Sequence, residues 1–183
     1  MVVHVFKVMD KTSIKTARYP AGLVTKISEI NGPAVNDLLN HYALELRMTQ
    51  SREIPGSYWR GDEAGLIDNC VYARSATPVH SVLHESCHFI CMAPTRRKAL
   101  HTNAGGDYDE ENAVCYLQIL LAGQLRDYGS QKMLLDMDAW GYTFRLASAG
   151  CWFREDADDA RQWLLNKGII GIDNLPTWNT RAT

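Results

Sequence analysis

The chain has 183 residues, of which 46% are hydrophobic and 22% charged, and its formal net charge is −2. This composition is typical of a soluble, globular protein rather than of a disordered one. The near-neutral charge supplies no basic surface of the kind that attracts nucleic acids or acidic membranes, so neither is expected as a partner. The length suits one domain, and we expect a single metal-dependent domain over residues 1–183.

The sequence contains no recognisable signal for export or membrane insertion. Its N-terminus lacks the basic start and apolar run of a signal peptide, and no window reaches about 18 uninterrupted apolar residues. The five cysteines are scattered and odd in number, which is typical of reduced, buried thiols. We therefore expect a cytoplasmic protein without a membrane span.

Short strands and one helix are predicted in the first part of the chain. Apolar alternation and turn-forming residues predict strands at 2–8, more weakly at 22–27, and at 70–73, a helix at 33–48 and an irregular segment at 51–69.

Helices dominate the rest of the chain. Thr77 as the N-cap and Pro78 as the first helical residue predict a helix that runs to about residue 92. Further helices are predicted at 109–128, 130–148 and 156–167, with a loop at 95–107 and an irregular tail. The expected fold is a compact, mostly α-helical α+β domain in which the helix at 77–92 packs on the apolar helix at 109–128.

The sequence His84-Glu85-Ser86-Cys87-His88 lies inside the first of these helices. Side chains four residues apart lie about 40° apart around a helix axis, so His84 and His88 point in the same direction. Two such imidazoles can bind one metal ion, while Glu85, about 100° from His84, can handle the proton of a metal-bound water. We predict His84 and His88 as metal ligands and Glu85 as the catalytic group; the alternative is a pair of structural histidines.

A catalytic metal ion usually has three protein ligands and one open position. The acidic start of the helix at 109–128 is the nearest source of a third ligand. Helical periodicity places Glu110 on the apolar stripe that must face the core, whereas Glu111 shares a more polar stripe with Cys115 and Gln118. We therefore predict Glu110 as the ligand, with Glu111 and then Asp109 as alternatives. The other interpretation is that these acids only complement the helix N-terminus.

Two further residues and one basic segment lie close to the motif. His80 and Cys91 are one turn before and one turn after the histidine pair, and we interpret both as structural rather than as ligands. The basic segment at 95–101 could hold an anionic substrate, although a solvent-exposed loop is the preferred interpretation.

His84-Glu85-x-x-His88, followed by a glutamate at 110 or 111, resembles the zincin-type metallopeptidases. That resemblance implies a zinc ion that polarises the scissile carbonyl and Glu85 as the general base. Such a reaction also needs a donor for the oxyanion, and the sequence does not choose among the candidates Tyr108, Tyr142 and His101.

A narrower resemblance extends outward from the motif. Asn69 and the run Val71-Tyr72-Ala73 precede the motif, Phe89 follows its second histidine, and the pair Arg96-Arg97 comes a few residues later. This arrangement is similar to the core of the elongation factor P hydroxylase family, from which Cys87 and Phe89 depart because serine and tryptophan are usual there. The resemblance implies an ion that activates oxygen beside a modified lysine side chain on a translation factor, with the arginine pair contacting that partner.

Two histidines and a carboxylate can hold zinc in hydrolases or iron in non-haem oxygenases, so the ligand types do not choose the metal. The leading hypothesis from the sequence is a mononuclear-metal enzyme that resembles the hydroxylases. Its substrate would be a protein or peptide, and the resemblance implies a translation factor. The alternatives are a zinc-dependent metallopeptidase and a non-catalytic metal-binding protein.

Overall fold

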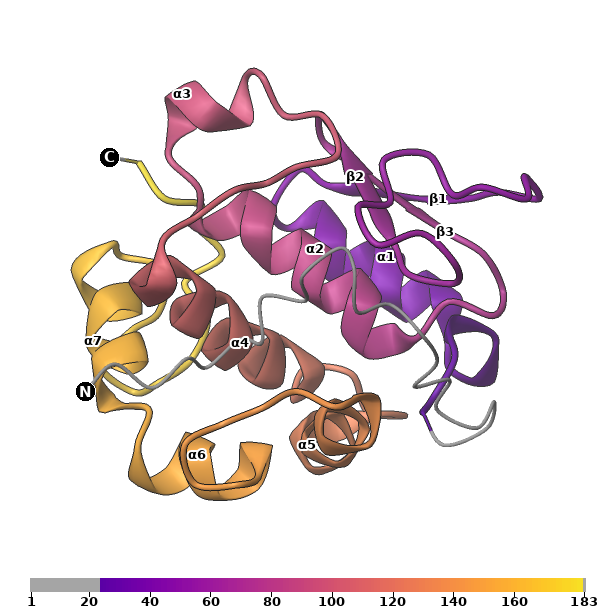
Figure 1. The fold of residues 1–183 in the computed structure, drawn as a ribbon. Coiled ribbons are helices and arrows are strands. Elements are labelled where there is room, and N and C mark those ends of the chain that lie inside the picture. The colour runs from indigo at the N-terminus through magenta and orange to yellow at the C-terminus, as the bar shows by residue number, and fades with distance from the viewer. Residues whose placement is uncertain (1–23, 183) are drawn as a thin grey trace, which may run out of the picture.

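The computed structural model describes residues 24–182, and these form a mostly helical α+β fold (Figure 1), which confirms the predicted class. The elements, in chain order, are the 3-10 helix η1 (Ile27–Glu29), α1 (Gly32–Asn40), β1 (Glu45–Met48), β2 (Gly65–Ile67), β3 (Cys70–Ala73), α2 (Val79–Cys91), α3 (Pro94–Arg97), α4 (Tyr108–Ala122), α5 (Gly129–Trp140), α6 (Ala149–Glu155) and α7 (Asp158–Asn166).

Helix α2 occupies the centre of the fold and carries the predicted metal-binding motif (Figure 1). It contacts β2 and β3 on one side and α4 on another. Every residue of α2 except His84 is buried. A helix that is covered on nearly all sides is held mainly by packing rather than by helix propensity, so α2 provides a rigid support for the motif.

Helix α4 is the second apolar helix and packs directly on α2, as predicted. It also contacts α5 and α7, and the side chains of Leu117, Ile119 and Leu121 are fully buried. Each such side chain contributes about 1.5–3 kcal/mol when it leaves water. The N-cap of α4 is Asp107, whose carboxylate accepts a hydrogen bond from the Glu110 backbone N–H at 2.9 Å.

The sheet is small and has the strand order β1-β3-β2. Strand β1 is parallel to β3 and β2 is antiparallel to it, which places Leu66 opposite Val71. Both of these side chains are fully buried, and the sheet lies against α2. The strand predicted at 70–73 is thus confirmed. Its burial against α2 explains why its sequence is a short apolar run.

The prediction of one helix over 33–48 is wrong in its second half. Helix α1 ends at Asn40, and the chain turns through Ala43, whose φ is 56°, before it enters β1. Strand β1 pairs with β3, and the Asn36 side chain accepts the Leu46 backbone N–H at 3.2 Å. These tertiary contacts satisfy the backbone of residues 45–48 and outweigh the helical spacing of their apolar side chains.

Helix α2 begins at Val79, with Pro78 as its N-cap. The predicted cap, Thr77, instead accepts the Arg74 backbone N–H through its hydroxyl at 2.9 Å, in the turn that precedes the helix. Because the threonine hydroxyl is engaged in this turn, it does not cap the helix, and α2 begins one residue later than predicted.

Residues 24–27 form no regular strand, because Lys26 makes only a single bridge to Pro78 before η1 begins. The strand predicted at 2–8 lies outside the described residues. The helix predicted at 130–148 ends at Trp140, where Gly141 has a left-handed φ of 97° that terminates α5. Helix α6 then fills part of the interval and was not predicted.

None of the helices among residues 24–182 combines the length and the apolar character that crossing a bilayer requires.

Gly65 in β2 has no room for a side chain. A Cβ atom at this position would lie 1.9 Å from the Pro55 carbonyl oxygen and 2.5 Å from the Ser57 nitrogen, and both are backbone atoms. We expect Gly65→Ala to lower the free energy of unfolding by about 2 kcal/mol or more, because the backbone must move. Gly32→Ala is the matched control, since its Cβ meets nothing within 4 Å. Urea denaturation measures both, and equal losses in the two variants would contradict the prediction.

Candidate metal centre

His84 and His88 meet on the part of α2 that faces α4. Their Nε2 atoms are 3.1 Å apart, and the two rings are nearly perpendicular, with an interplanar angle of 87°. His88 is 6% exposed, while His84 is half-buried. The predicted convergence of the two imidazoles on one face of the helix is therefore present in the fold.

Glu111 on α4 completes a group of three candidate ligands with these histidines, called here the histidine–glutamate cluster. Its Oε1 atom is 3.6 Å from His88 Nε2, and the donor atoms of all three residues lie within 4.8 Å of one another. Ligand atoms on a tetrahedral ion with bonds of about 2.0–2.1 Å are roughly 3.3–3.4 Å apart. The spacing thus suits one small cation, and the Glu111 side chain is 26% exposed, so one side of the cluster reaches solvent.

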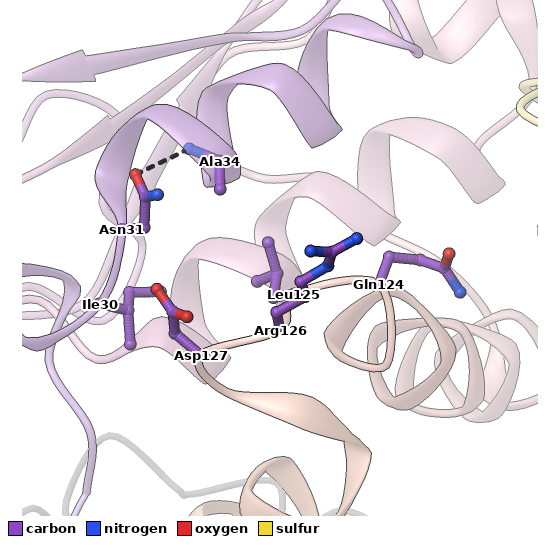
Figure 2. Close-up of a pocket in the computed structure, with 7 residues that line it drawn as sticks. All are labelled: Ile30, Asn31, Ala34, Gln124, Leu125, Arg126 and Asp127. Carbon is purple, nitrogen blue, oxygen red and sulfur yellow. Dashed lines mark hydrogen bonds between the residues drawn. The ribbon is translucent and has the colours of Figure 1, made fainter.

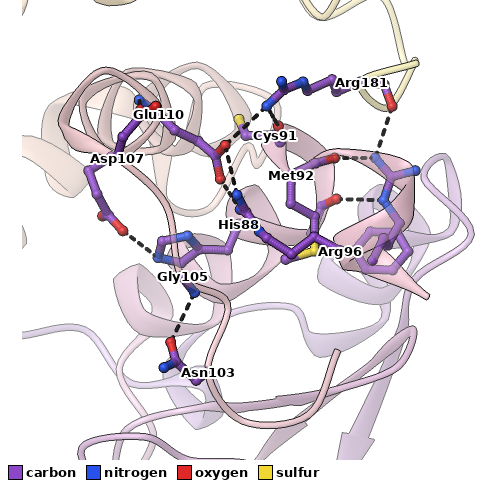
Figure 3. Close-up of polar contacts among 12 residues, drawn as sticks. His88, Cys91, Met92, Arg96, Asn103, Gly105, Asp107, Glu110 and Arg181 are labelled. Atoms are coloured by element: carbon purple, nitrogen blue, oxygen red, sulfur yellow. Dashed lines mark hydrogen bonds and ion pairs between the residues drawn. The ribbon is translucent and has the colours of Figure 1, made fainter. Parts of the chain in front are cut away.

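The carboxylate that approaches the histidines is Glu111, the first alternative from the sequence, and not the preferred Glu110. Glu110 is buried, but its carboxylate forms ion pairs with Arg96 and Arg181 (Figure 3). Helical phase correctly predicted that Glu110 is buried. It could not show that two arginines from other segments occupy that face. The second alternative, Asp109, is exposed.

Gln118, two turns after Glu111 on α4, holds His84 in one orientation. The Gln118 amide nitrogen donates to the Met133 sulfur at 3.9 Å, and its Oε1 atom is 2.8 Å from His84 Nδ1. The imidazole therefore donates from Nδ1 and keeps the Nε2 lone pair directed toward the cluster. This is the tautomer that a metal ligand needs, and such a partner is typical of metal-binding histidines.

Burial keeps both histidines neutral. It lowers the pKa of His84 to about 4 and lowers the pKa of His88 well below its ordinary value. The neighbouring His84 and the Arg96 guanidinium lower the pKa of His88 further. Since only the neutral imidazole binds a metal ion, both side chains are in the form required at neutral pH.

Glu85 is 9% exposed and close enough to Glu63 and Glu111 for their charges to affect it. Burial raises the pKa of Glu85 to about 8, and the two neighbouring carboxylates contribute to this increase. A carboxyl group with a pKa in this range can accept and release a proton near neutral pH. This property suits the role that the motif predicts for Glu85.

Glu63 is a further, half-buried acid near the motif that the sequence did not indicate. Burial raises its pKa to about 7, whereas a hydrogen bond with Trp140 lowers it. The backbone N–H of the next residue, Ala64, donates to the Ser81 hydroxyl at 2.9 Å, which holds this loop against α2 one turn before Glu85. Glu63 lies in a turn-rich segment without periodicity, so no sequence signal connected it with the motif.

Aromatic residues from the end of α5 and the segment after it cover one side of the motif. The Tyr142 ring centroid is 5.9 Å from that of His84 and 5.7 Å from that of His80, and Tyr142 also hydrogen-bonds Gln118. Burial raises the pKa of Tyr142 well above its ordinary value, so its hydroxyl stays protonated. Of the three oxyanion-donor candidates, Tyr142 contacts the site, Tyr108 is exposed, and His101 is exposed and bridges to Ile67.

His80 and Cys91, which the sequence led us to interpret as structural, are both buried and lie outside the histidine–glutamate cluster. His80 packs on Trp140, with ring centroids 4.9 Å apart, and neither of its ring nitrogens has a hydrogen-bond partner among the described residues. Burial lowers the pKa of His80 to about 3, which keeps this ring neutral.

The two arginines of the basic segment after α2 bind other parts of the fold. Arg97 donates to the backbone oxygens of Phe89 at 2.9 Å and Met92 at 2.8 Å, while Arg96 binds Glu110. These contacts close the C-terminal end of α2, whose last carbonyls have no helical partner. Both arginines therefore have partners within the fold, while the Arg96 side chain is still 37% exposed.

A cavity of about 220 Å³ lies between the start of α1 and the α4–α5 connection (Figure 2). Its lining includes Asn31, which caps α1, and the side chains of Arg126 and Asp127. None of its lining residues belongs to the histidine–glutamate cluster or its neighbours, so we do not assign it to the same site.

Comparisons of the chain with protein-family models, with curated proteins and with solved structures give no significant match. The two family resemblances in the sequence therefore stay predictions, and the functional argument depends on the geometry of the site.

In the metal-free protein, Glu85 should make stability fall as the pH rises from about 4.5 to about 8. Its pKa is about 8 in the folded protein against an ordinary value of 4.5, so within this window the folded state binds more protons and the unfolding free energy decreases with pH. The buried histidines have the opposite effect, but only below their unfolded pKa of about 6.5.

Glu85→Gln removes the carboxyl group that binds a proton in the folded state in this pH range. We expect the variant to lose less stability than the wild type between pH 6.5 and 8.5, by roughly 1 kcal/mol or more. Urea denaturation in the presence of a chelator measures the two pH profiles. Parallel profiles across this range would show that the carboxyl group does not titrate as described.

Proposed function

We propose that this protein is a mononuclear-metal enzyme in which His84, His88 and Glu111 bind the ion and Glu85 handles protons beside it. The observation that carries the proposal is the close approach of two neutral imidazoles and one carboxylate from two packed helices. Three protein ligands with one side open to solvent are the usual arrangement of a catalytic ion. The Gln118 contact, which holds His84 in the ligating tautomer, gives independent support.

Hydrolysis is the reaction that this arrangement favours. A bound zinc-like ion would lower the pKa of a water molecule and polarise a substrate carbonyl. Glu85 would take the proton of that water and later pass it to the leaving group, because the motif places its buried carboxyl beside the two histidines. The substrate class we propose is a peptide or another amide, in line with the zincin-like motif.

Tyr142 would serve the same reaction beside His84. Burial raises the pKa of Tyr142, so its hydroxyl stays protonated. The Tyr142 ring lies next to the His84 ring. A fixed hydroxyl donor of this kind can stabilise the negative charge that develops on a substrate oxygen. Among the three donor candidates from the sequence, we therefore propose Tyr142.

Oxygen-dependent hydroxylation is the second candidate function. The observation that favours it is the ligand set itself, because two histidines and one carboxylate also hold iron in non-haem oxygenases. The resemblance to elongation factor P hydroxylases would then make a lysine-type side chain on a translation factor the substrate. The five cysteines are all unpaired thiols, which supports the cytoplasm as the proposed location for either function.

Purified protein should contain about one zinc or iron ion per chain, and His88→Ala or Glu111→Gln should reduce this content to below about a tenth. The matched control is His101→Ala, because His101 is an exposed histidine outside the cluster. Elemental analysis of the three variants gives both the identity of the metal and the ligand set. Metal retained at wild-type level in both ligand variants would exclude this site.

Glu85→Gln should retain the metal and lose activity by about 100-fold or more, because the variant cannot accept the proton of the attacking water. The measurement is turnover of a quenched fluorescent peptide library under anaerobic conditions. Peptide cleavage without oxygen supports the hydrolase, whereas oxygen-dependent activity with bound iron supports the hydroxylase. Unchanged biological function of the variant would instead favour a non-catalytic metal-binding protein.

A further inference from the structure

Glu110 and Glu111 are neighbours on α4, but their carboxylates have different partners. Glu111 lies 3.6 Å from His88, whereas Glu110 binds the guanidinium groups of Arg96 and Arg181. These last three residues are called here the arginine–glutamate triad (Figure 3). Consecutive side chains on a helix point about 100° apart, so the rotation of α4 that directs one of them away also directs the other toward the histidines.

The triad connects three separate segments of the chain and buries its carboxylate, while the Arg96 side chain is 37% exposed. The Glu110 side chain is only 4% exposed, and that of Arg181 is 18% exposed. Arg96 donates from Nη1 to Glu110 Oε2 at 3.3 Å, and Arg181 donates to the same oxygen at 3.1 Å. A buried carboxylate without such partners would be strongly destabilising, so Glu110 depends on both arginines.

Arg181 reaches this position because the C-terminal segment runs along the end of α2. Its backbone N–H donates to the Ile90 carbonyl at 2.9 Å, and its Nη1 atom is 3.4 Å from the Cys91 carbonyl. The Arg181 carbonyl accepts from Arg97 Nη2 at 3.1 Å, and the guanidinium lies over the Trp163 ring at 5.4 Å. Arg181 thus binds the last turn of α2, which contains His88, and also the first turn of α4, which contains Glu111.

We propose that Arg181 is a positioning residue for the metal centre: by holding Glu110 against the end of α2, it sets the rotation of α4 that turns Glu111 toward His84 and His88. The inference rests on the proposed metal site and extends it to a residue far away in the sequence. Arg96 also binds Glu110, whereas Arg181 hydrogen-bonds both the end of α2 and Glu110 on α4. The C-terminal segment is therefore part of the architecture of the site.

The test compares Arg181→Ala, Arg181→Lys and the control Arg145→Ala in the full chain. Arg145 also forms an ion pair with an acid, Asp156, so its loss removes one charge and one ion pair elsewhere in the fold. Zinc affinity is measured by competition with a chromophoric chelator. The visible absorption of the cobalt-loaded protein reports the geometry around the metal, which general destabilisation of a folded protein would not change.

We expect Arg181→Ala to weaken zinc binding by about tenfold or more and to alter the cobalt spectrum, because loss of a supporting contact typically costs 10–100-fold in metal affinity. Arg181→Lys should give an intermediate loss, since lysine keeps the charge but not the forked geometry. Arg145→Ala should stay within about twofold of the wild type. Urea denaturation confirms that each variant is folded at the assay temperature.

A folded Arg181→Ala protein with wild-type zinc affinity and an unchanged cobalt spectrum would overturn the inference and leave the metal site intact. Where the alanine variant does not fold, the lysine variant decides by the same two measurements. Failure of wild-type protein to bind either metal would overturn the proposed function and, with it, this inference.

Discussion

The packing of α2 against α4 is the contact on which the candidate site depends. These two helices are buried together, and each brings part of the ligand set, with His84 and His88 from α2 and Glu111 from α4. Close-packed helices have little freedom to rotate or slide, because their side chains interdigitate. The separations within the histidine–glutamate cluster are therefore determined by the core rather than by flexible loops. A metal site needs this kind of rigid support.

Burial determines the chemistry of the same region. It lowers the pKa values of the histidines and raises those of Glu63, Glu85 and Glu111, so all of these groups tend toward their neutral forms without an ion. A divalent cation would reverse that tendency for the coordinating carboxylate, because its charge compensates a buried anion. Metal binding and folding stability would then be coupled. The neighbouring Glu110 carboxylate is paired with two arginines.

Local patterns in the sequence were sufficient to predict the central helices and the position of the motif on one of them. Helix α2, helix α4, strand β3 and the buried contact between the two helices follow from the pattern of apolar residues. The same patterns failed at β1, where pairing with β3 overrides helical spacing, and at α6, which is too short for periodicity to reveal. At β1 the deciding contact comes from a segment distant in the sequence.

The sequence by itself determined that His84 and His88 share one face of a helix and that Glu85 lies beside them, because helical geometry depends only on local spacing. It narrowed the candidates for a third metal ligand to the acidic start of α4 but could not choose among neighbouring acids. Only the tertiary structure decided that Glu111 faces the histidines, since the choice depends on where Arg96 and Arg181 bind Glu110. Packing between segments likewise brings three other residues to the site: Gln118, Glu63 and Tyr142. Such contacts cannot be predicted from a local sequence pattern.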